Sequence, residues 1–201
     1  MIKAIVYDMD GMLFYEPHYF TAELEQLYGI LKEESLFAKD PKYGACKRGE
    51  ISLDEFFKPY YFKWQKHKRF NLSFEEAKGA WFDFTQIDEE VVALAKSLKQ
   101  VGIKNIIATN NVRERTDYLR EKNGLDETFV VFGSPDFGVM KPDEEFFTKL
   151  MNKLELKPEE VLYYDDKEST IAQLKKFGFD AVVYESIEKF KKDLEERKIK
   201  Y

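Results

Sequence analysis

The chain has 201 residues, of which 44% are hydrophobic and 35% charged, and its formal net charge is −6. This length suits one α/β domain with or without a smaller inserted one, and the composition excludes a disordered chain. A mildly acidic chain is a poor match for nonspecific binding to nucleic acid, which demands basic patches, so no nucleic-acid partner is expected.

The ends and the cysteine content indicate neither a membrane protein nor a secreted one. No apolar run approaches the roughly 20 residues that a bilayer-spanning helix needs. The N-terminal stretch MIKAIVYDMDG is only briefly apolar and is interrupted by acids, unlike a signal peptide. Cys46 is the only cysteine, so no internal disulfide can form. We therefore expect a cytoplasmic protein, as a monomer or a small homo-oligomer, with no membrane partner.

The first predicted element is a buried strand. Residues 3–7 form a short β-branched run that ends in Asp8 and Gly11, which is typical of a strand followed by a turn. A helical region then extends from about Pro17 to Phe84, where no strong strand signal occurs.

Within this helical region, Ser-x-x-Glu patterns at Ser52 and Ser73 predict two helix starts. An apolar stripe at helical spacing predicts a packed core rather than a pocket, and Pro59 inside it predicts a kinked or split helix. The stripe consists of Leu53, Phe56, Phe57, Tyr60, Tyr61 and Trp64.

After residue 84, strands and helices alternate. Further strands are predicted at residues 105–109, 129–132, 161–164 and 181–184. Helices are predicted at residues 89–99, 112–122, 143–154, 169–177 and 187–198. This alternation implies a parallel sheet with right-handed crossovers, to which the inserted helical region cannot belong.

The predicted fold class is therefore α/β. We expect a Rossmann-like, doubly wound parallel sheet with strand order 5-4-1-2-3 and an inserted, all-helical cap domain. The core domain would comprise residues 1–15 and 86–201, and the cap residues 16–85.

Ligands bind at the carboxyl ends of the strands in such a sheet, and polar residues collect just beyond those ends. They are Asp8, Asp10, Thr109, Asn110, Asn111, Lys141, Asp165 and Asp166. Taken singly, each motif also fits an ordinary turn or helix cap. Together they place four acids, a hydroxyl and a lysine at one edge.

Such a group of acids calls for a cation, because clustered carboxylates repel one another. Oxygen-only ligands favour a hard ion such as Mg²⁺, which also bridges substrate phosphate. A metal and a lysine would let a carboxylate attack a phosphate, giving an aspartyl phosphate. A second acid two residues on can protonate the leaving group and later deprotonate water.

These residues resemble the haloacid dehalogenase-like superfamily, in the branch with a helical cap inserted after the first strand. All four motifs of that superfamily occur in order, and the likeness covers essentially the whole chain. They are Asp8-Met9-Asp10-Gly11-Met12-Leu13, Ala108-Thr109-Asn110, Lys141-Pro142 and Tyr164-Asp165-Asp166.

The resemblance implies a role for each motif. Asp8 would be the nucleophile and a metal ligand, and Asp10 the general acid/base, with its backbone carbonyl on the metal. Thr109 would hydrogen-bond the transferring phosphoryl group, aided by backbone amides near Asn110, and Lys141 would neutralise charge on Asp8 and on that group.

The fourth motif would complete the metal site. Asp166 matches the direct metal ligand, and Asp165 would act through water. The following residues, Lys167 to Thr170, depart from the commonest pattern of small or amide side chains, which leaves the outer metal shell open.

The same resemblance separates the possible activities. True dehalogenases lack an acid at the position of Asp10, so a magnesium-dependent phosphatase acting on a small phosphorylated metabolite is the main prediction. Sugar-phosphate mutases keep both acids but usually carry a hinge histidine, which would fall at Phe20, and His18 is out of step. A non-catalytic regulatory scaffold is a weaker alternative, because a scaffold needs no nucleophile.

Charges in the helical region leave two interpretations open. Lys47 and Arg48, in a predicted loop before Gly49, could bind a substrate anion or simply be solvated. Cys46 has no paired histidine in view and is interpreted as structural or incidental.

Overall fold

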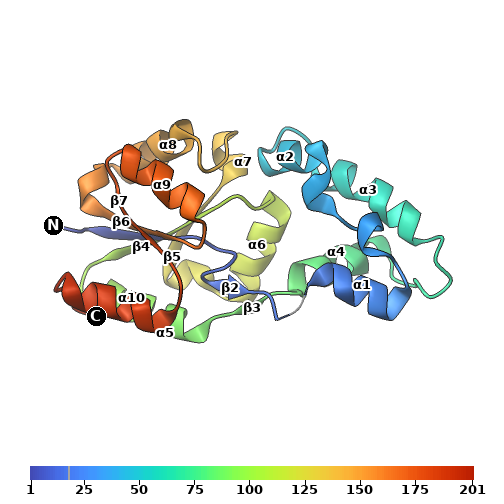
Figure 1. The fold of residues 1–201 in the computed structure, drawn as a ribbon, viewed down its shortest axis with the longest axis horizontal. Helices are drawn as coiled ribbons and strands as arrows, with labels where there is room; N and C mark the ends of the chain where they lie inside the picture. The colour runs from blue at the N-terminus through green and yellow to red at the C-terminus, as the bar shows by residue number, and fades with distance from the viewer. Residues whose placement is uncertain (18) are drawn as a thin grey trace.

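The computed structural model describes residues 1–17 and 19–201. Its centre is a five-stranded parallel sheet in the order β5-β4-β1-β6-β7 (Figure 1). The strands are β1 (Ala4–Tyr7), β4 (Lys104–Thr109), β5 (Phe129–Gly133), β6 (Val161–Asp165) and β7 (Asp180–Val183). Counted over these strands alone, this is the predicted order 5-4-1-2-3 read from the opposite edge.

The strand labels run higher than predicted because the sequence did not indicate a second, two-stranded sheet. It pairs β2 (Phe14–Tyr15) with β3 (Gln86–Ile87) in antiparallel fashion, with Tyr15 opposite Gln86. Strands of two residues are too short for any alternation of apolar and polar side chains to be recognised.

Helices cover both faces of the parallel sheet, as the doubly wound prediction requires. Alternate residues of β1 point to opposite faces: Ile5 and Tyr7 belong to one buried cluster, and Ala4 and Val6 to the other. The first cluster includes side chains from α5 (Glu89–Gln100), α6 (Arg113–Lys122) and α10 (Ile187–Glu196). The second includes side chains from α7 (Ser134–Phe137), α8 (Glu144–Leu154) and α9 (Glu168–Lys176).

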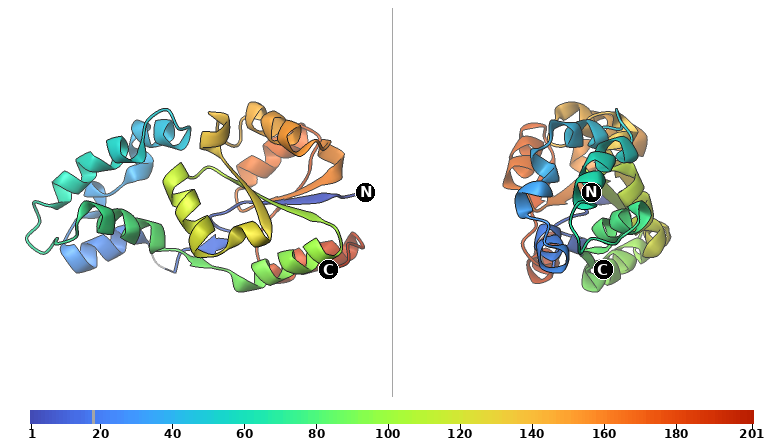
Figure 2. Two further views of the ribbon diagram at one scale, coloured as in Figure 1. Left: turned by 180° about the vertical axis from the view of Figure 1, so that it is seen from behind. Right: turned by 90° about the vertical axis from the view of Figure 1, so that its right-hand side faces the viewer.

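The described residues between β2 and β3 form four α-helices, which we call the helical segment. It lies beyond the carboxyl ends of the strands in Figure 1 and in the left view of Figure 2. The helices are α1 (Phe20–Tyr28), α2 (Pro41–Lys47), α3 (Leu53–Trp64) and α4 (Phe74–Asp83). Short 3₁₀ turns also occur, at η1 (Lys32–Glu34), η2 (Phe37–Lys39), η3 (Leu125–Glu127) and η4 (Pro158–Glu160). The division into a core and a cap domain stays a prediction.

The helical segment has an aromatic core of its own, as the predicted stripe indicated. Phe57 stacks on Trp81 with ring centroids 5.8 Å apart and meets Trp64 edge-on at 5.4 Å. Phe20, at the position where a mutase would carry its hinge histidine, is buried in this cluster. His18 lies outside the described residues.

Helix α3 does not split at Pro59, so that alternative of the sequence prediction was wrong. The helix runs continuously from Leu53 to Trp64. A proline there removes one backbone hydrogen bond. Burial of the side chains on both sides of it, including Phe56, Phe57 and Trp64, keeps the helix in one piece.

The predicted helix starts are present. Ser73 and Glu76 form a complete capping box, and the Ser52 hydroxyl accepts the Glu55 N–H at 3.1 Å. None of the helices in residues 1–17 and 19–201 has the length and apolarity needed to cross a membrane.

Candidate active site

The predicted residues meet at the carboxyl edge of the sheet. Asp8 directly follows β1, Thr109 ends β4 and Asp165 ends β6, while Lys141 comes from the loop between α7 and α8. All four, together with Asp10 and Asn110, line one cavity of about 140 Å³. Asp166 lies beside it, within the same carboxylate cluster as Asp8 and Asp165.

Lys141 forms the buried centre of the site. Its ammonium donates to Asp8 Oδ1 and to Asp165 Oδ2, both at 2.8 Å, and the side chains of all three residues are at most 4% exposed. Burial alone would lower the pKa of Lys141, but the carboxylates of Asp8 and Asp165 raise it well above its usual range. Lys141 is therefore a permanent cation.

Asp8 is held ionised. Burial alone would raise the pKa of this carboxyl, but the charges of Lys141 and Lys167 and hydrogen bonds from Lys141 and the Met9 N–H hold it below its usual range. The Met9 N–H donates to Asp8 Oδ1 at 2.8 Å. With two donors on Oδ1, the carboxylate has a fixed orientation.

Asp166 brings a third carboxylate. Oxygens of Asp8, Asp165 and Asp166 lie within 4.8 Å of one another. Burial and the charges of Asp8 and Asp165 raise the pKa of Asp166, although Lys167 opposes them. Gly11 has φ +90°, and a β-carbon there would lie 2.5 Å from Asp166 Oδ2, so this close approach requires glycine.

This cluster fits a hard divalent cation. Its donors are carboxylate oxygens only, which suits such an ion. Lys167, which was not predicted as a site residue, already places a positive charge there: its Nζ lies 3.6 Å from Asp8 Oδ2 and 3.3 Å from Asp166 Oδ1. Both oxygens of Asp165 have other partners, namely Lys141 Nζ and the Lys167 N–H.

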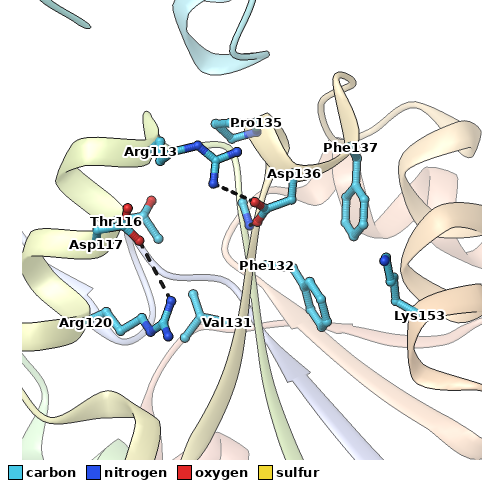
Figure 3. Close-up of a pocket in the computed structure, with 11 residues that line it drawn as sticks. Arg113, Thr116, Asp117, Arg120, Val131, Phe132, Pro135, Asp136, Phe137 and Lys153 are labelled. Atoms are coloured by element: carbon cyan, nitrogen blue, oxygen red, sulfur yellow. Dashed lines mark hydrogen bonds and ion pairs between the residues drawn. The ribbon is translucent and has the colours of Figure 1, made fainter. Parts of the chain in front are cut away.

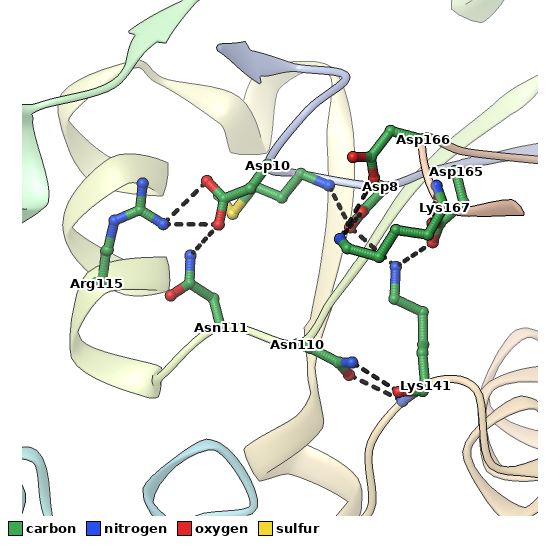
Figure 4. A network of polar contacts seen from close by, with 10 residues as sticks. Asp8, Asp10, Asn110, Asn111, Arg115, Lys141, Asp165, Asp166 and Lys167 are labelled. Atoms are coloured by element: carbon green, nitrogen blue, oxygen red, sulfur yellow. Dashed lines mark hydrogen bonds and ion pairs between the residues drawn. The ribbon is translucent and has the colours of Figure 1, made fainter. Parts of the chain in front are cut away.

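Asp10 belongs to a separate ionic group on the other side of the site (Figure 4). Both of its carboxylate oxygens accept from Arg115 Nη1, at 3.0 and 2.8 Å, and Oδ2 also accepts from Asn111 at 3.0 Å. The carboxylate is turned toward α6 and away from Asp8. Arg115 also donates to Thr85 Oγ1 at 3.0 Å, next to the start of β3.

The side chain of Asn110, at the wall of the cavity, is hydrogen-bonded to the backbone of Lys141. Its amide donates to the Lys141 carbonyl and accepts the Lys141 N–H, both at 2.8 Å. It thereby fixes the backbone that carries the buried lysine. A phosphate-binding role for the region around Asn110 stays a prediction and rests on its backbone amide. Thr109 is buried and lines the cavity, as expected.

Sequence reasoning missed three residues of the site. Arg115 lies on α6, where seven of the ten residues are charged, so that apolar periodicity gives no sign that one arginine is buried. Asn111 was expected at the edge of the sheet but was given no role beyond a possible helix cap, and Lys167 was noted only as a departure from the usual pattern.

Lys47 and Arg48, the two neighbouring cations of the helical segment, lie in different surroundings. Lys47 ends α2 and lines the catalytic cavity, with its Nζ 4.2 Å from the centroid of the Tyr43 ring. Burial lowers the pKa of Lys47. Arg48 pairs with Glu50 at 2.5 Å and does not line that cavity.

A larger cavity, of about 370 Å³, lies at the β5 edge of the sheet (Figure 3). Its charges are largely paired: Arg113 bonds Asp136 at 2.8 Å, and Arg120 lies 3.8 Å from Asp117. None of the clustered carboxylates lines it. Shifted pKa values and clustered charges indicate a catalytic site better than cavity volume does. The smaller cavity has both, so it is the candidate active site.

Comparison with known proteins now identifies the family. The model of the haloacid dehalogenase-like hydrolases matches residues 2–178. The chain belongs to this family of hydrolases. A curated relative, the sesquiterpene phosphatase AstK of Aspergillus oryzae, is 27% identical over 177 residues, covering 85% of this chain and 84% of the relative.

Solved structures of the haloacid dehalogenase-like family share the fold. A family enzyme from Bacteroides thetaiotaomicron, solved with magnesium and inorganic phosphate, has a TM-score of 0.76 at 18% identity, over 93% of this chain and 96% of that one. The L-2-haloacid dehalogenase of Xanthobacter autotrophicus has a TM-score of 0.67 at 19% identity, over 99% of this chain and 84% of that one. At such identities the likeness concerns the fold alone.

Proposed function

We propose that this hydrolase is a magnesium-dependent phosphatase that removes the phosphoryl group from a small phosphomonoester by way of Asp8. The observation that carries the proposal is the ionised, oriented Asp8 carboxylate beside the buried Lys141 ammonium. A lysine 2.8 Å from a carboxylate lowers the repulsion that a phosphate dianion meets on approach. The curated relative of Aspergillus oryzae, a phosphatase by name, agrees with this activity.

In the proposed reaction, a carboxylate oxygen of Asp8 forms a bond to phosphorus while the bond from phosphorus to the ester oxygen breaks. The leaving alcohol takes a proton from Asp10. A water oxygen then bonds to phosphorus and gives its proton to Asp10, while the bond from phosphorus to the Asp8 oxygen breaks, which restores the Asp8 carboxylate and releases inorganic phosphate. Thr109 lines the cavity where the phosphoryl group would lie.

Mg²⁺, when bound, would supply the positive charge that stabilises the transferring phosphoryl group. We propose Asp8 and Asp166 as its side-chain ligands, with the Asp10 carbonyl as predicted. We propose that Asp165 holds Lys141 in place instead of binding the metal directly, since it accepts a hydrogen bond of 2.8 Å from the Lys141 ammonium.

Asp10 must turn before it can act as the proton donor. Its carboxylate is bound by Arg115 and Asn111 and points away from Asp8 (Figure 4). Because Arg115 also bonds Thr85 at the junction with the helical segment, we propose that this segment acts as a cap over the site. Its closure would exclude water during attack on Asp8.

The leaving group would be an apolar alcohol. A third cavity, of about 220 Å³, lies in the helical segment. Most of its described lining residues are aromatic, and among them Glu16 is the one charged residue and none is a lysine or an arginine. It adjoins the active site at two points: Lys47 lies over Tyr43, and Arg115 lies 5.4 Å from the Phe84 ring. A hydrocarbon group fits such walls, and a second phosphate group does not. The relative named as a sesquiterpene phosphatase is consistent with this substrate class.

Hydrolysis of p-nitrophenyl phosphate tests the reaction. The purified protein should release nitrophenol with Mg²⁺ and stop on addition of EDTA. Asp8→Asn should reduce kcat by about 10⁴-fold or more. Asp136→Asn, which removes a carboxylate paired with Arg113 outside the site, should leave kcat unchanged. Full activity of Asp8→Asn would rule out the nucleophile.

Comparison of geranyl phosphate with glucose 6-phosphate tests the substrate class. We expect kcat/KM to favour geranyl phosphate by at least about tenfold. Tyr19 is 72% exposed and lines the aromatic cavity, so Tyr19→Ser should fold normally and reduce that preference. Isomerisation of glucose 1-phosphate without release of phosphate, dependent on a hexose bisphosphate, would instead identify a mutase.

A further inference from the structure

The carboxylate cluster divides its oxygens between two lysines. Lys141 Nζ and the Met9 N–H occupy Asp8 Oδ1, while Lys141 also holds Asp165 Oδ2. Asp165 Oδ1 accepts the Lys167 backbone N–H. Of the three oxygens then left over, Asp8 Oδ2 and Asp166 Oδ1 are those that Lys167 Nζ approaches, at 3.6 and 3.3 Å. Lys167 therefore stands where the remaining negative charge converges.

The two lysines are anchored very differently. The Lys141 side chain is 4% exposed and both of its contacts are 2.8 Å long. The Lys167 side chain is 60% exposed, and its ammonium contacts are longer than ordinary charge-assisted hydrogen bonds. Its backbone N–H, however, donates to Asp165 Oδ1 at 3.0 Å. The ammonium can thus leave the cluster while the backbone stays in place.

The charge of the cluster favours binding of either a metal ion or the Lys167 ammonium, but not both. Three carboxylates with both lysines retain one net negative charge. If a divalent ion replaces the Lys167 ammonium, the cluster becomes neutral. If the ion and the ammonium bind together, two cations lie within a few ångströms of each other on the same oxygens and repel strongly. This repulsion disfavours binding of both cations at Asp8 Oδ2 and Asp166 Oδ1 at the same time.

We propose that Lys167 is a built-in counter-ion that occupies the metal position of the metal-free enzyme and is displaced when the metal binds. Lys167 thereby weakens metal binding, and it keeps the carboxylate cluster stable while no metal is bound. The inference rests on the proposed magnesium site and adds a residue that sets how readily that site fills.

The test is titration of the metal-free protein with MgCl₂ by calorimetry at constant ionic strength. Lys167→Met should bind Mg²⁺ at least about tenfold more tightly than the wild type, because no ammonium has to be displaced. Lys167→Arg, which keeps the charge, should bind with nearly the wild-type affinity. Lys192→Met is the matched control: Lys192 is an exposed lysine 3.7 Å from Glu196, far from the cluster in sequence and outside its contacts.

Thermal unfolding gives a readout that needs neither substrate nor turnover. In EDTA, Lys167→Met should melt about 3 °C below the wild type, because the three carboxylates lose a counter-ion, and saturating Mg²⁺ should remove the difference. Equal or weaker Mg²⁺ binding by Lys167→Met, with normal binding by the wild type, overturns the Lys167 proposal and leaves the proposed function intact. Failure of every variant and of the wild type to bind Mg²⁺ overturns both.

Discussion

The carboxyl edge of the sheet and the helical segment are stabilised in opposite ways. At the sheet edge, buried charges are held by a few short, directed contacts, such as the two 2.8 Å bonds of Lys141. In the helical segment, aromatic rings pack on one another, as Phe57 does on Trp81, while Tyr61 and Trp64 also donate to backbone carbonyls. Directed contacts fix atoms to fractions of an ångström, as chemistry requires, whereas ring packing fixes a shape.

The largest effect should come from removing the charge at the centre of the edge. Lys141→Met removes the buried cation that bonds both Asp8 and Asp165 and leaves only the exposed Lys167 ammonium nearby, which should cost about 3–5 kcal/mol of unfolding free energy. It should also lower kcat by about 10²–10³-fold, because an electrostatic stabiliser of the transferring group is lost. Urea denaturation and steady-state kinetics measure the two. If Lys141→Met were as stable as the wild type, the buried charges at the sheet edge would not depend on Lys141 for their stability.

Removal of a buried aromatic ring from the helical segment should lower the stability of the protein without changing its turnover. Phe57 is fully buried, and Phe57→Ala should cost about 3–5 kcal/mol of unfolding free energy. Turnover of p-nitrophenyl phosphate per folded molecule should stay within about twofold, since Phe57 is not among the residues that line the catalytic cavity. A tenfold loss of turnover in a folded variant would show that the aromatic core takes part in catalysis.

A smaller effect is expected where the two regions meet. Arg115→Met should lower kcat about tenfold and change KM by less than about twofold, because Arg115 links Asp10 to Thr85 at the junction with the helical segment, and so links the turning of Asp10 to the proposed closure after the substrate has bound. Arg113→Met is the control, since Arg113 lies on the same helix and pairs with Asp136 instead. Equal effects of both substitutions would assign Arg115 to the stability of α6 rather than to the orientation of Asp10.

The smallest effect concerns pH. Because burial and neighbouring carboxylates raise the pKa of Asp166 in the folded state, the folded protein holds this proton at a pH where the unfolded chain has lost it. That stabilisation is complete below the unfolded pKa of about 3.9 and is lost as the pH rises through the folded pKa.

In EDTA, Asp166→Asn should therefore be more stable than the wild type at pH 7, by less than about 1 kcal/mol given the screening of a partly exposed group. The two should be equally stable near pH 3.5. Thermal melts at both pH values test this. With Mg²⁺ the order should reverse, since the wild type alone gains a ligand-bound state. A wild type that is the more stable in EDTA at pH 7 would contradict the raised pKa.

Much of the fold and most of the site were predictable because β-branched runs mark strand ends. Asp8, Thr109 and Asp165 each sit at such an end, and parallel strands bring their carboxyl ends to one edge. Lys141 was predicted at the same edge although it follows the end of β5 only after the short helix α7 and a loop, and its role beside Asp8 came from the family resemblance alone.

The rest depended on distances that no local pattern encodes. Arg115 reaches Asp10 across more than a hundred residues of sequence, and Lys47 enters the cavity from a helix with its own core. The β2–β3 pair was too short to recognise. The continuity of α3 through Pro59 was decided by packing, which outweighs the local preference of proline.

The pairing of Tyr15 with Gln86 has a consequence for how such a chain can change over evolution. The chain leaves the core through β2 and returns through β3, and these two strands pair directly. The helical segment is therefore joined to the rest of the protein through this one pair of strands. A turn of hairpin length could join the two positions without altering the register of any parallel strand. The insertion can thus be exchanged for another of different size, and substrate choice can diversify while the chemical groups at the sheet edge stay unchanged.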